Sequence, residues 1–340
     1  MSEDDWSVDG SGGTTLVHPA LFYQGLDDYL AGVGGFVSAG LAAGEPVLVA
    51  VPGPRLGPLR ERLGPAGAAV TFADMTELGR NPGRILAALR EFADRHADRR
   101  SRVVGEPIWP ERSPAEVREA TRHEALINLA FAGRPVSILC PYDTDGLEPY
   151  VLKDALRTHP EVIQDGELVA SGCYVDPAEV CADCDTELPE PAAAERLAYS
   201  AGGLAEVRRW LDDRLARTGL DRQQRGDLVL AVGEATGNSV VHGGGSGVLR
   251  LWTAPGEVVA EVRDAGWLRD PLAGRRRPGL ATADGGRGLW MIHQLCDLVE
   301  VRAAPSGLTL RLHMTVLARQ PTGRVAGRWA DRGAHHADGR

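Results

Sequence analysis

The sequence predicts an α/β protein of two domains, on three observations. The first half alternates short apolar runs with amphipathic stretches, which is typical of a parallel sheet wound with helices on both faces. The Pro/Ala-rich stretch ELPEPAAA, at 187–194, has no periodicity and indicates a linker. The second half shows two helical patterns, strands, a Gly-rich loop, a helix and two more strands. That order indicates a layered α/β sandwich with an antiparallel or mixed sheet.

The first domain is expected at residues 15–172, after an acidic segment, 1–14, that we expect to be disordered. Four apolar runs predict buried parallel strands, at 45–52, 69–75, 102–106 and 136–143. The patterns between them predict helices at 29–43, 54–63, 84–97 and 113–132. The last helix opens with Ser113-Pro114-Ala115-Glu116, which is a capping-box sequence with proline in the first turn.

The second domain is expected at 198–317, between a linker at 173–197 and an Arg/Gly-rich tail, 318–340, that we expect to be disordered. An apolar stripe predicts its first helix, which stops near Gly219. Asp221 and Gln224 cap the second helix, which contains DLVLAVGEATGNSVVH. Strands follow at 248–253 and 258–263, then a loop at 265–287, a helix at 288–296, and strands at 298–302 and 308–315.

Composition and charge narrow the class of protein. The 340 residues are 43% hydrophobic, enough for two cores, and the net charge of −10 argues against a general nucleic-acid-binding surface. No signal-peptide pattern and no apolar run of membrane-spanning length is present, and five cysteines form no dense disulfide framework. We expect a cytoplasmic, reduced protein that contacts neither nucleic acid nor membrane directly.

The second helix of the second domain carries two polar residues that suit nucleotide chemistry. Glu234 and Asn238 are four residues apart and share one helix face. An amide oxygen suits Mg²⁺, and a carboxylate one turn away can accept a proton from an attacking hydroxyl. On the helix alone, a solvent-facing polar stripe is the simpler interpretation.

Two Gly-bearing turns follow in the order that an ATP·Mg²⁺ site needs. Asp264 ends a strand before Gly266, and its carboxylate can accept a hydrogen bond from an exocyclic amine such as that of adenine. Gly286-Arg287-Gly288 precedes a helix, whose first N–H groups can bind phosphate. An ordinary turn or loop end also explains each feature taken alone.

In this order, EATGN, DAG and GGRGL resemble the N box and the two glycine boxes of the gyrase/histidine-kinase/MutL-type ATP-binding superfamily. The short lid and GGRGLWMIHQLCDLVEVR resemble most the bacterial anti-sigma-factor serine kinases. The resemblance covers about residues 198–314 and implies an α/β sandwich of the histidine-kinase-like ATPase type. It also implies ATP and Mg²⁺ as cofactors, and an anti-anti-sigma (STAS-type) protein or a sigma factor as the partner.

The resemblance implies a role for each motif residue. Glu234 would be the general base toward a serine of the anti-anti-sigma protein, Asn238 would chelate Mg²⁺, and Asp264 would recognise adenine. The glycines Gly266, Gly286 and Gly288 would shape the nucleotide pocket and the lid, and Arg287 between the last two is a further cofactor-binding position. Thr309 would help to hold the adenine side.

Two departures from the family pattern leave an alternative open. Trp267 follows the first glycine box where a second glycine is usual, and the lid carries Arg275-Arg276-Arg277. This triple arginine could contact a γ-phosphate or an acidic partner, although a solvated loop is the simpler interpretation. The alternative function is a non-catalytic signalling module that binds a nucleotide or a protein partner.

The first domain resembles the MEDS-type sensory domain of bacterial regulators, through LVHPALFY, GLAAGEPVLVAV, GEPIWPERSPAEVREATRHEALINLAF and LCPYD. This resemblance implies a RecA/KaiC-like fold and an unknown small ligand. GFVSAGLAAGEP lacks the Gly-Lys-Ser/Thr ending of a phosphate loop, so we expect no ATP hydrolysis in this half. Candidates for the ligand pocket, each explained more simply by packing or capping, are His18, Glu106, His123, Glu124, Cys140 and Tyr142.

Three cysteines lie near the expected linker. Cys173, Cys181 and Cys184 could hold a zinc ion with one further ligand, but no second pair and no suitably spaced histidine accompanies them. A metal-responsive redox sensor is therefore a third and weaker hypothesis. The sequence is also compatible with a homodimer.

Overall fold

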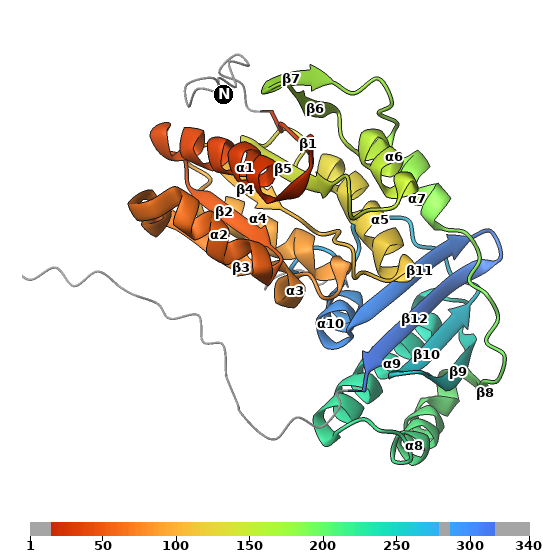
Figure 1. Cartoon of the computed structure of the whole chain (residues 1–340). Helices are drawn as coiled ribbons and strands as arrows, with labels where there is room; N and C mark the ends of the chain where they lie inside the picture. Colours follow the sequence, from red (N-terminus) through yellow and green to blue (C-terminus); the bar gives the residue numbers. More distant parts are fainter. Residues whose placement is uncertain (1–14, 279–285, 317–340) are drawn as a thin grey trace, which may run out of the picture.

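The structure is a computed structural model that describes residues 15–278 and 286–316. Figure 1 shows an N-terminal domain in red to green and a C-terminal domain in green to blue. Each domain has its own sheet, so the predicted two-sheet α/β class is confirmed. The segments that we expected to be disordered, 1–14 and 318–340, lie outside the described residues.

The N-terminal sheet has seven strands in the order β3-β2-β4-β5-β1-β6-β7. Neighbouring strands are parallel from β3 to β6, and β7 is antiparallel at one edge. The central strands are buried throughout, because helices cover both faces. The strands are β1 (Pro19–Tyr23), β2 (Val47–Val51), β3 (Val70–Asp74), β4 (Ser101–Gly105), β5 (Val136–Asp143), β6 (Glu161–Gln164) and β7 (Glu167–Ala170).

Helices sandwich this sheet in three layers, as Figure 1 shows. One face packs against α1 (Gly25–Ala42) and α2 (Gly53–Leu63). The other packs against α4 (Ile85–Arg95), α5 (Pro114–Ala130) and α6 (Pro149–Thr158). The predicted capping box of α5 is present, since the Ser113 and Glu116 side chains each bond the other's backbone N–H. The remaining helices are α3 (Met75–Leu78) and α7 (Pro177–Cys184).

The C-terminal domain has a five-stranded antiparallel sheet in the order β11-β12-β10-β9-β8. Three helices cover one face and share an apolar core with it: α8 (Leu204–Leu215), α9 (Arg222–His242) and α10 (Arg287–Leu295). The strands are β8 (Glu195–Ser200), β9 (Ser246–Ala254), β10 (Glu257–Asp264), β11 (Leu298–Ala304) and β12 (Gly307–Thr315). No described helix has the length and apolar composition to cross a membrane.

The expected linker, 173–197, is more structured than its composition suggests. Residues 177–184 form α7, which packs against α5, and 195–200 form β8, which pairs with β9. Residues 187–194 contain neither helix nor strand and run beside the C-terminal sheet. There the Glu190 carboxylate binds Arg250 and Arg263, and the Pro189 carbonyl oxygen accepts from Arg311.

The sheet face of the C-terminal domain away from its helices is charged and largely buried. Glu261 on β10 is fully buried and binds Arg250 and Arg311 of the neighbouring strands. On the same face His313 bridges two carboxylates, with Nδ1 at 3.0 Å from Glu257 Oε2 and Nε2 at 3.0 Å from Glu300 Oε1. Paired charges of this kind tolerate burial because each has a counter-ion.

We expect the free energy of unfolding to fall as pH rises toward 9, because of His313. Burial alone lowers the pKa of His313, but the hydrogen bonds to Glu257 and Glu300 outweigh it and raise the pKa from 6.5 to about 9. The folded state therefore holds this proton more tightly than the unfolded chain. The stabilisation is complete below about pH 6.5, and up to about 3 kcal/mol is lost through pH 9. Urea titrations across this range measure it, and the same loss in His313→Gln would contradict the assignment.

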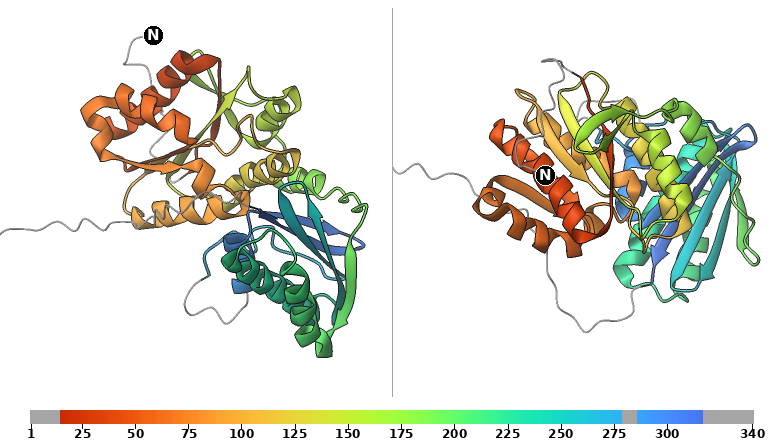
Figure 2. Two further views of the ribbon diagram at one scale, coloured as in Figure 1. Left: turned by 60° about the horizontal axis from the view of Figure 1, so that its bottom comes forward. Right: turned by 45° about the horizontal axis from the view of Figure 1, so that its top comes forward.

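The two domains dock along α5 and the segment before α4, and both views of Figure 2 place the C-terminal sheet beside the yellow helix α5. Arg122 of α5 donates to the Val301 carbonyl oxygen of β11 over 3.1 Å. Asn81 donates to the carbonyl oxygen of His293 in α10 over 3.0 Å. Gly83 lies so close to this helix that a Cβ there would be 2.1 Å from Nδ1 of His293. The two domains are thus joined by direct hydrogen bonds and by close packing of α10 against Gly83.

Candidate functional site

The structure brings Glu234 and Asn238 together with Gly288. Both side chains project from one face of α9 toward the first turn of α10, as their spacing predicts. A Cβ on Gly288 would lie 2.7 Å from Oε2 of Glu234 and 3.3 Å from Nδ2 of Asn238. A Cβ at this position would displace the end of the Glu234 side chain, so glycine keeps the space where α10 starts free for the two polar groups. Neither polar group has a hydrogen-bond partner among the described residues.

Asp264 sits at the end of β10 with its carboxylate held from two sides. The Ser239 hydroxyl of α9 donates to one oxygen, and the Gly266 N–H donates to the other over 2.7 Å. A Cβ on Gly243 would lie 2.4 Å from the carboxylate carbon, and one on Gly266 would lie 2.6 Å from its nearer oxygen. These contacts use two of about four lone-pair directions, so the carboxylate can still accept a further hydrogen bond.

Three residues around Asp264 were not predicted from the sequence. Ser239 follows Asn238 directly on α9, and Gly243 is the residue just after the helix ends at His242. The His242-Gly243 pair in the sequence was a signal for Gly243. Tyr199 comes from β8, where a Cβ on the paired residue Gly247 would lie 2.4 Å from its hydroxyl oxygen. Burial raises the pKa of Tyr199 to about 12, and the Asp264 charge acts in the same direction. Only the fold brings Tyr199 to this carboxylate, so no local pattern indicates it.

Thr309 and Asp264 both line a cavity at this end of the sheet, but the Thr309 side chain is on the opposite face from the Asp264 carboxylate. Alternate residues of β10 up to Val262 pack against the helices, which places Asp264 on the helix-covered face. Its partner on β12 is Leu308, whereas Thr309 pairs with Arg263 and therefore points to the opposite face. The expectation that Thr309 holds the adenine side is corrected accordingly. The neighbouring side chain on the helix-covered face is that of Leu308.

The second glycine box begins α10. Gly286 precedes the helix with a φ of 83°, a left-handed conformation that favours glycine, and Arg287 is the first helical residue. The backbone N–H groups of this first turn face no intrahelical acceptor and are suited to an anion. Residues 279–285, which include Gly285, lie outside the described residues.

The described part of the lid, 265–278, packs against the N-terminal domain. Arg275 is fully buried, and its guanidinium lies 3.0 Å from the Glu119 carboxylate of α5. Leu272 joins the N-terminal apolar core. Arg277 contacts Glu91 of α4 at 3.6 Å, on the surface. The interpretation of the triple arginine as a solvated loop is therefore wrong for Arg275, whose acidic partner is in the same chain.

Glu119 gathers three arginines in a fully buried cluster. Its carboxylate binds Arg302 of β11 at 2.5 Å and Arg275 at 3.0 Å, and Arg122 lies at 3.6 Å. Burial raises the pKa of the Glu119 carboxyl, but the three positive charges outweigh it and lower the pKa overall. Asp185, after α7, adds a second carboxylate at 2.8 Å from Arg122. The docking of the two domains thus depends on a buried ionic network.

Four of the six candidate ligand residues of the N-terminal domain separate into two groups. Glu106 follows β4 and accepts a hydrogen bond from Tyr23, while Arg55 donates to the Tyr23 hydroxyl oxygen and to Asp143. Burial raises the pKa of Glu106 to about 7. The second group, at a distance from the first along β5, contains His18, Glu124 and Cys140. GFVSAGLAAGEP falls within and just after α1, so it does not form a strand-to-helix phosphate loop.

The three cysteines near the linker do not form a metal-ligand group in the part of the chain that the structure describes. Cys181 and Cys184 are buried on α7 against α5, whereas Cys173 is exposed. Burial raises the pKa of the Cys184 thiol to about 12. Packing explains the two buried thiols, Cys181 and Cys184.

Comparisons with known proteins agree with this architecture. Residues 17–160 match the family model of MEDS, the methanogen/methylotroph DcmR sensory domain, and residues 198–314 match that of the histidine kinase-like ATPase domain. A search of curated proteins gave no match. Among solved structures, the RsbU and RsbW domains of Rv1364c from Mycobacterium tuberculosis are 21% identical with a TM-score of 0.28. That match covers 37% of this chain and 32% of the other, so this chain spans about a third of its length. The chain therefore joins a MEDS sensory domain to a histidine kinase-like ATPase domain.

Proposed function

We propose that residues 198–314 bind ATP·Mg²⁺ and phosphorylate a serine of an anti-anti-sigma (STAS-type) partner, under the control of the sensory domain. The observation that carries the proposal is the convergence of Glu234 and Asn238 on Gly288. A general base, an amide oxygen and the N-terminus of a helix then meet at one place. The order of the motifs EATGN, DAG and GGRGL resembles that of the anti-sigma-factor serine kinases, and this resemblance supports the choice of partner.

The residues fit the nucleotide and its ion. The Asn238 oxygen would complete the coordination of Mg²⁺, the first turn of α10 would hold phosphate oxygens, and the Asp264 carboxylate would accept from the adenine amino group. When bound, ATP supplies the phosphoryl group. Glu234 would accept the proton that the serine hydroxyl loses, and Gly288 leaves the space that both side chains need.

A second candidate function is a switch by occupancy, in which the domain binds nucleotide and a partner, such as a sigma factor, without catalysis. The packing of Arg275 and Leu272 against the N-terminal domain favours it, because a lid held there can transmit occupancy without chemistry. Exposed Trp267, in place of the usual second glycine, is consistent with the same function.

Incubation of the full chain with labelled ATP and candidate STAS proteins, scored for phosphoserine, tests the proposal. Phosphoserine on a STAS partner supports the kinase. Nucleotide binding without transfer to any partner supports the occupancy switch instead. Absence of ATP binding would overturn both functions.

We expect Asn238→Ala to weaken ATP binding about tenfold in the presence of Mg²⁺, which corresponds to ~1.4 kcal/mol. The reason is the loss of the Asn238 amide oxygen, which faces the start of α10. Calorimetry with and without Mg²⁺ measures the effect, and the two proteins should bind alike when the ion is removed. An equal loss without Mg²⁺ would show that Asn238 has no part in metal coordination.

A further inference from the structure

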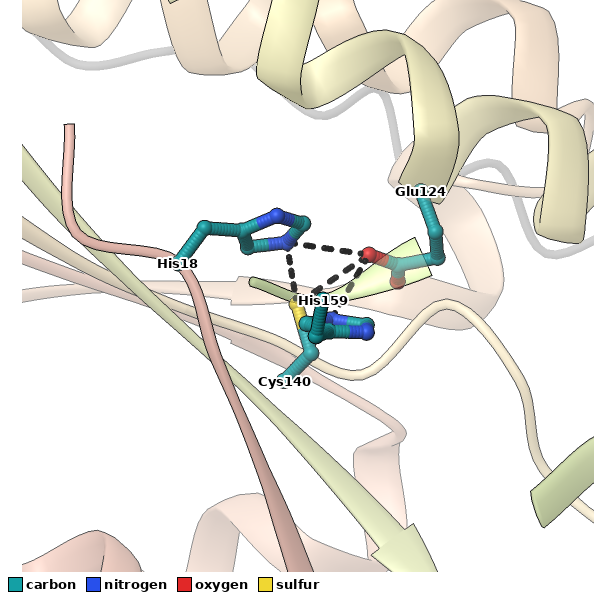
Figure 3. A group of neighbouring side chains, drawn as sticks. All are labelled: His18, Glu124, Cys140 and His159. Atoms are coloured by element: carbon teal, nitrogen blue, oxygen red, sulfur yellow. Dashed lines mark hydrogen bonds and ion pairs between the residues drawn. The ribbon is translucent and has the colours of Figure 1, made fainter. Parts of the chain in front are cut away.

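Four buried side chains of the sensory domain point toward one another, as Figure 3 shows. They are His18 just before β1, Glu124 on α5, Cys140 on β5 and His159 just after α6. One nitrogen, oxygen or sulfur atom from each lies within 4.8 Å of all the others, and all four residues are buried. The elements that supply them are far apart in sequence, so the four side chains meet only in the folded domain.

Both histidine nitrogens lie too far from Glu124 for strong hydrogen bonds, whereas the Cys140 thiol lies at an ordinary hydrogen-bond distance. Nε2 of His18, Nε2 of His159 and Sγ of Cys140 lie 3.3, 3.4 and 3.3 Å from the same Glu124 oxygen. Good hydrogen bonds to a carboxylate are about 2.7–2.9 Å long when the donor is charged. The other Glu124 oxygen and Nε2 of His159 have no hydrogen-bond partner among the described residues. Hydrogen bonding thus leaves buried polar atoms unsatisfied, which is costly.

Four of the six separations between the ligand atoms suit the corners of a tetrahedron. Ligand atoms bound at about 2.0–2.3 Å to a tetrahedral zinc ion lie about 3.3–3.8 Å from one another. The separations are 3.3 Å from His18 to Glu124, 3.5 Å from His18 to Cys140, 3.3 Å from Cys140 to Glu124 and 3.4 Å from His159 to Glu124. The ligand atoms of the two remaining pairs, from His159 to His18 and to Cys140, lie within 4.8 Å of each other.

The outer hydrogen bonds orient both histidines for metal binding. Nδ1 of His18 lies 3.0 Å from the side-chain oxygen of Asn128, and Nδ1 of His159 lies 2.8 Å from the carbonyl oxygen of Ala155. Asn128 is fixed in this orientation, because its NH₂ group donates to the Thr158 carbonyl oxygen. Each Nδ1 therefore carries the proton, and each Nε2 presents a lone pair to the centre.

We propose that His18, Glu124, Cys140 and His159 form a four-coordinate site for a divalent transition-metal ion of the zinc type. Two neutral imidazoles, one thiolate and one carboxylate carry two negative charges, which balance the ion in a buried site. The mixed nitrogen, sulfur and oxygen donors disfavour Mg²⁺ and Ca²⁺, which take oxygen ligands. Four protein ligands leave no open position, so the ion has a structural or sensing role and does not activate water.

Titration of the metal-free full chain with Co²⁺ alone, and then with Zn²⁺, tests the site. We expect one equivalent of Co²⁺ to bind in tetrahedral geometry with a thiolate-to-cobalt charge-transfer band, and Zn²⁺ to displace it. In Cys140→Ser the band should disappear, and in His159→Gln affinity should fall at least tenfold. The matched control is the double variant Cys181→Ser/Cys184→Ser, which removes the nearby C-x-x-C pair and should leave the band unchanged.

X-ray absorption on the zinc-loaded wild-type protein keeps the test valid if a variant fails to fold. The expected first shell is one sulfur at ~2.3 Å and three nitrogen or oxygen atoms at ~2.0–2.2 Å. Two or more sulfur ligands, loss of the band in the double variant, or no stoichiometric binding by the wild-type protein would overturn the proposal.

Discussion

Glu234→Gln is expected to slow phosphoryl transfer to the partner serine by about 10²–10⁴-fold, which is the usual contribution of a general base. Glutamine keeps the shape of the side chain beside Gly288 but cannot take the proton of the hydroxyl. ATP affinity should therefore stay unchanged, since the Asn238 amide and the Asp264 carboxylate remain. Rates of phosphoserine formation under saturating ATP, together with calorimetric binding, separate the two quantities.

A matched control for this variant is Asp227→Asn, which removes a carboxylate from the same helix. Asp227 lies seven residues earlier on α9, about 10 Å along the helix axis from Glu234. It should transfer phosphate at the wild-type rate. Unchanged transfer in Glu234→Gln would refute the catalytic role, while ATP binding in the same protein would leave the nucleotide site standing.

Glu119→Gln is expected to separate the lid from the sensory domain. Removal of one partner from a buried ion pair typically costs about 3–5 kcal/mol, because the remaining charge has no counter-ion. Arg302 and Arg122 keep Glu300 and Asp185, but Arg275 keeps no carboxylate partner among the residues that the structure describes. Trypsin cleaves after arginine, so the released Arg275-Arg276 segment should be cut much faster than in the wild-type protein.

Glu91→Gln provides the control for this experiment, because it acts on the same lid from an exposed position. The Arg277–Glu91 pair is on the surface, and such pairs contribute about 0–1 kcal/mol. Its cleavage rate should match that of the wild-type protein. Equal rates in both variants would mean that Glu119 does not hold the lid, and a thermal unfolding curve distinguishes local release from loss of the fold.

Much of the fold could be predicted from local sequence. The runs that form β2 and β5 are mostly apolar, those that form β3 and β4 have an apolar centre, and α5 has a complete capping box. The strands β1, β6, β7 and β8 were not predicted as strands. β8 is mostly exposed and polar, and β1 contains proline, so their extended form depends on pairing with neighbours that no local pattern reveals.

The candidate site was predictable where its residues share an element. Glu234 and Asn238 are on one helix, so their spacing alone places them on one face. Tyr199 and the burial of Arg275 depend on strands and domains that meet only in the folded chain. His159 is separated from His18 by 141 residues, so no motif length could have joined it to the cluster. Thr309 was assigned to the adenine side wrongly, because successive residues of a strand point to opposite faces of the sheet. An error of one position therefore moves a side chain to the other face.

Helix α5 leaves little room for neutral substitution. Of its seventeen residues only Pro114, Arg118 and Leu129 are exposed, although it lies at the edge of its own domain. One side meets the sensory sheet, and the other meets β11 of the ATPase domain. Most mutations in this helix will therefore affect two cores at once, and a change that improves one must be matched by its neighbour. The two domains are free to diverge in their loops, but along α5 their sequences must change together.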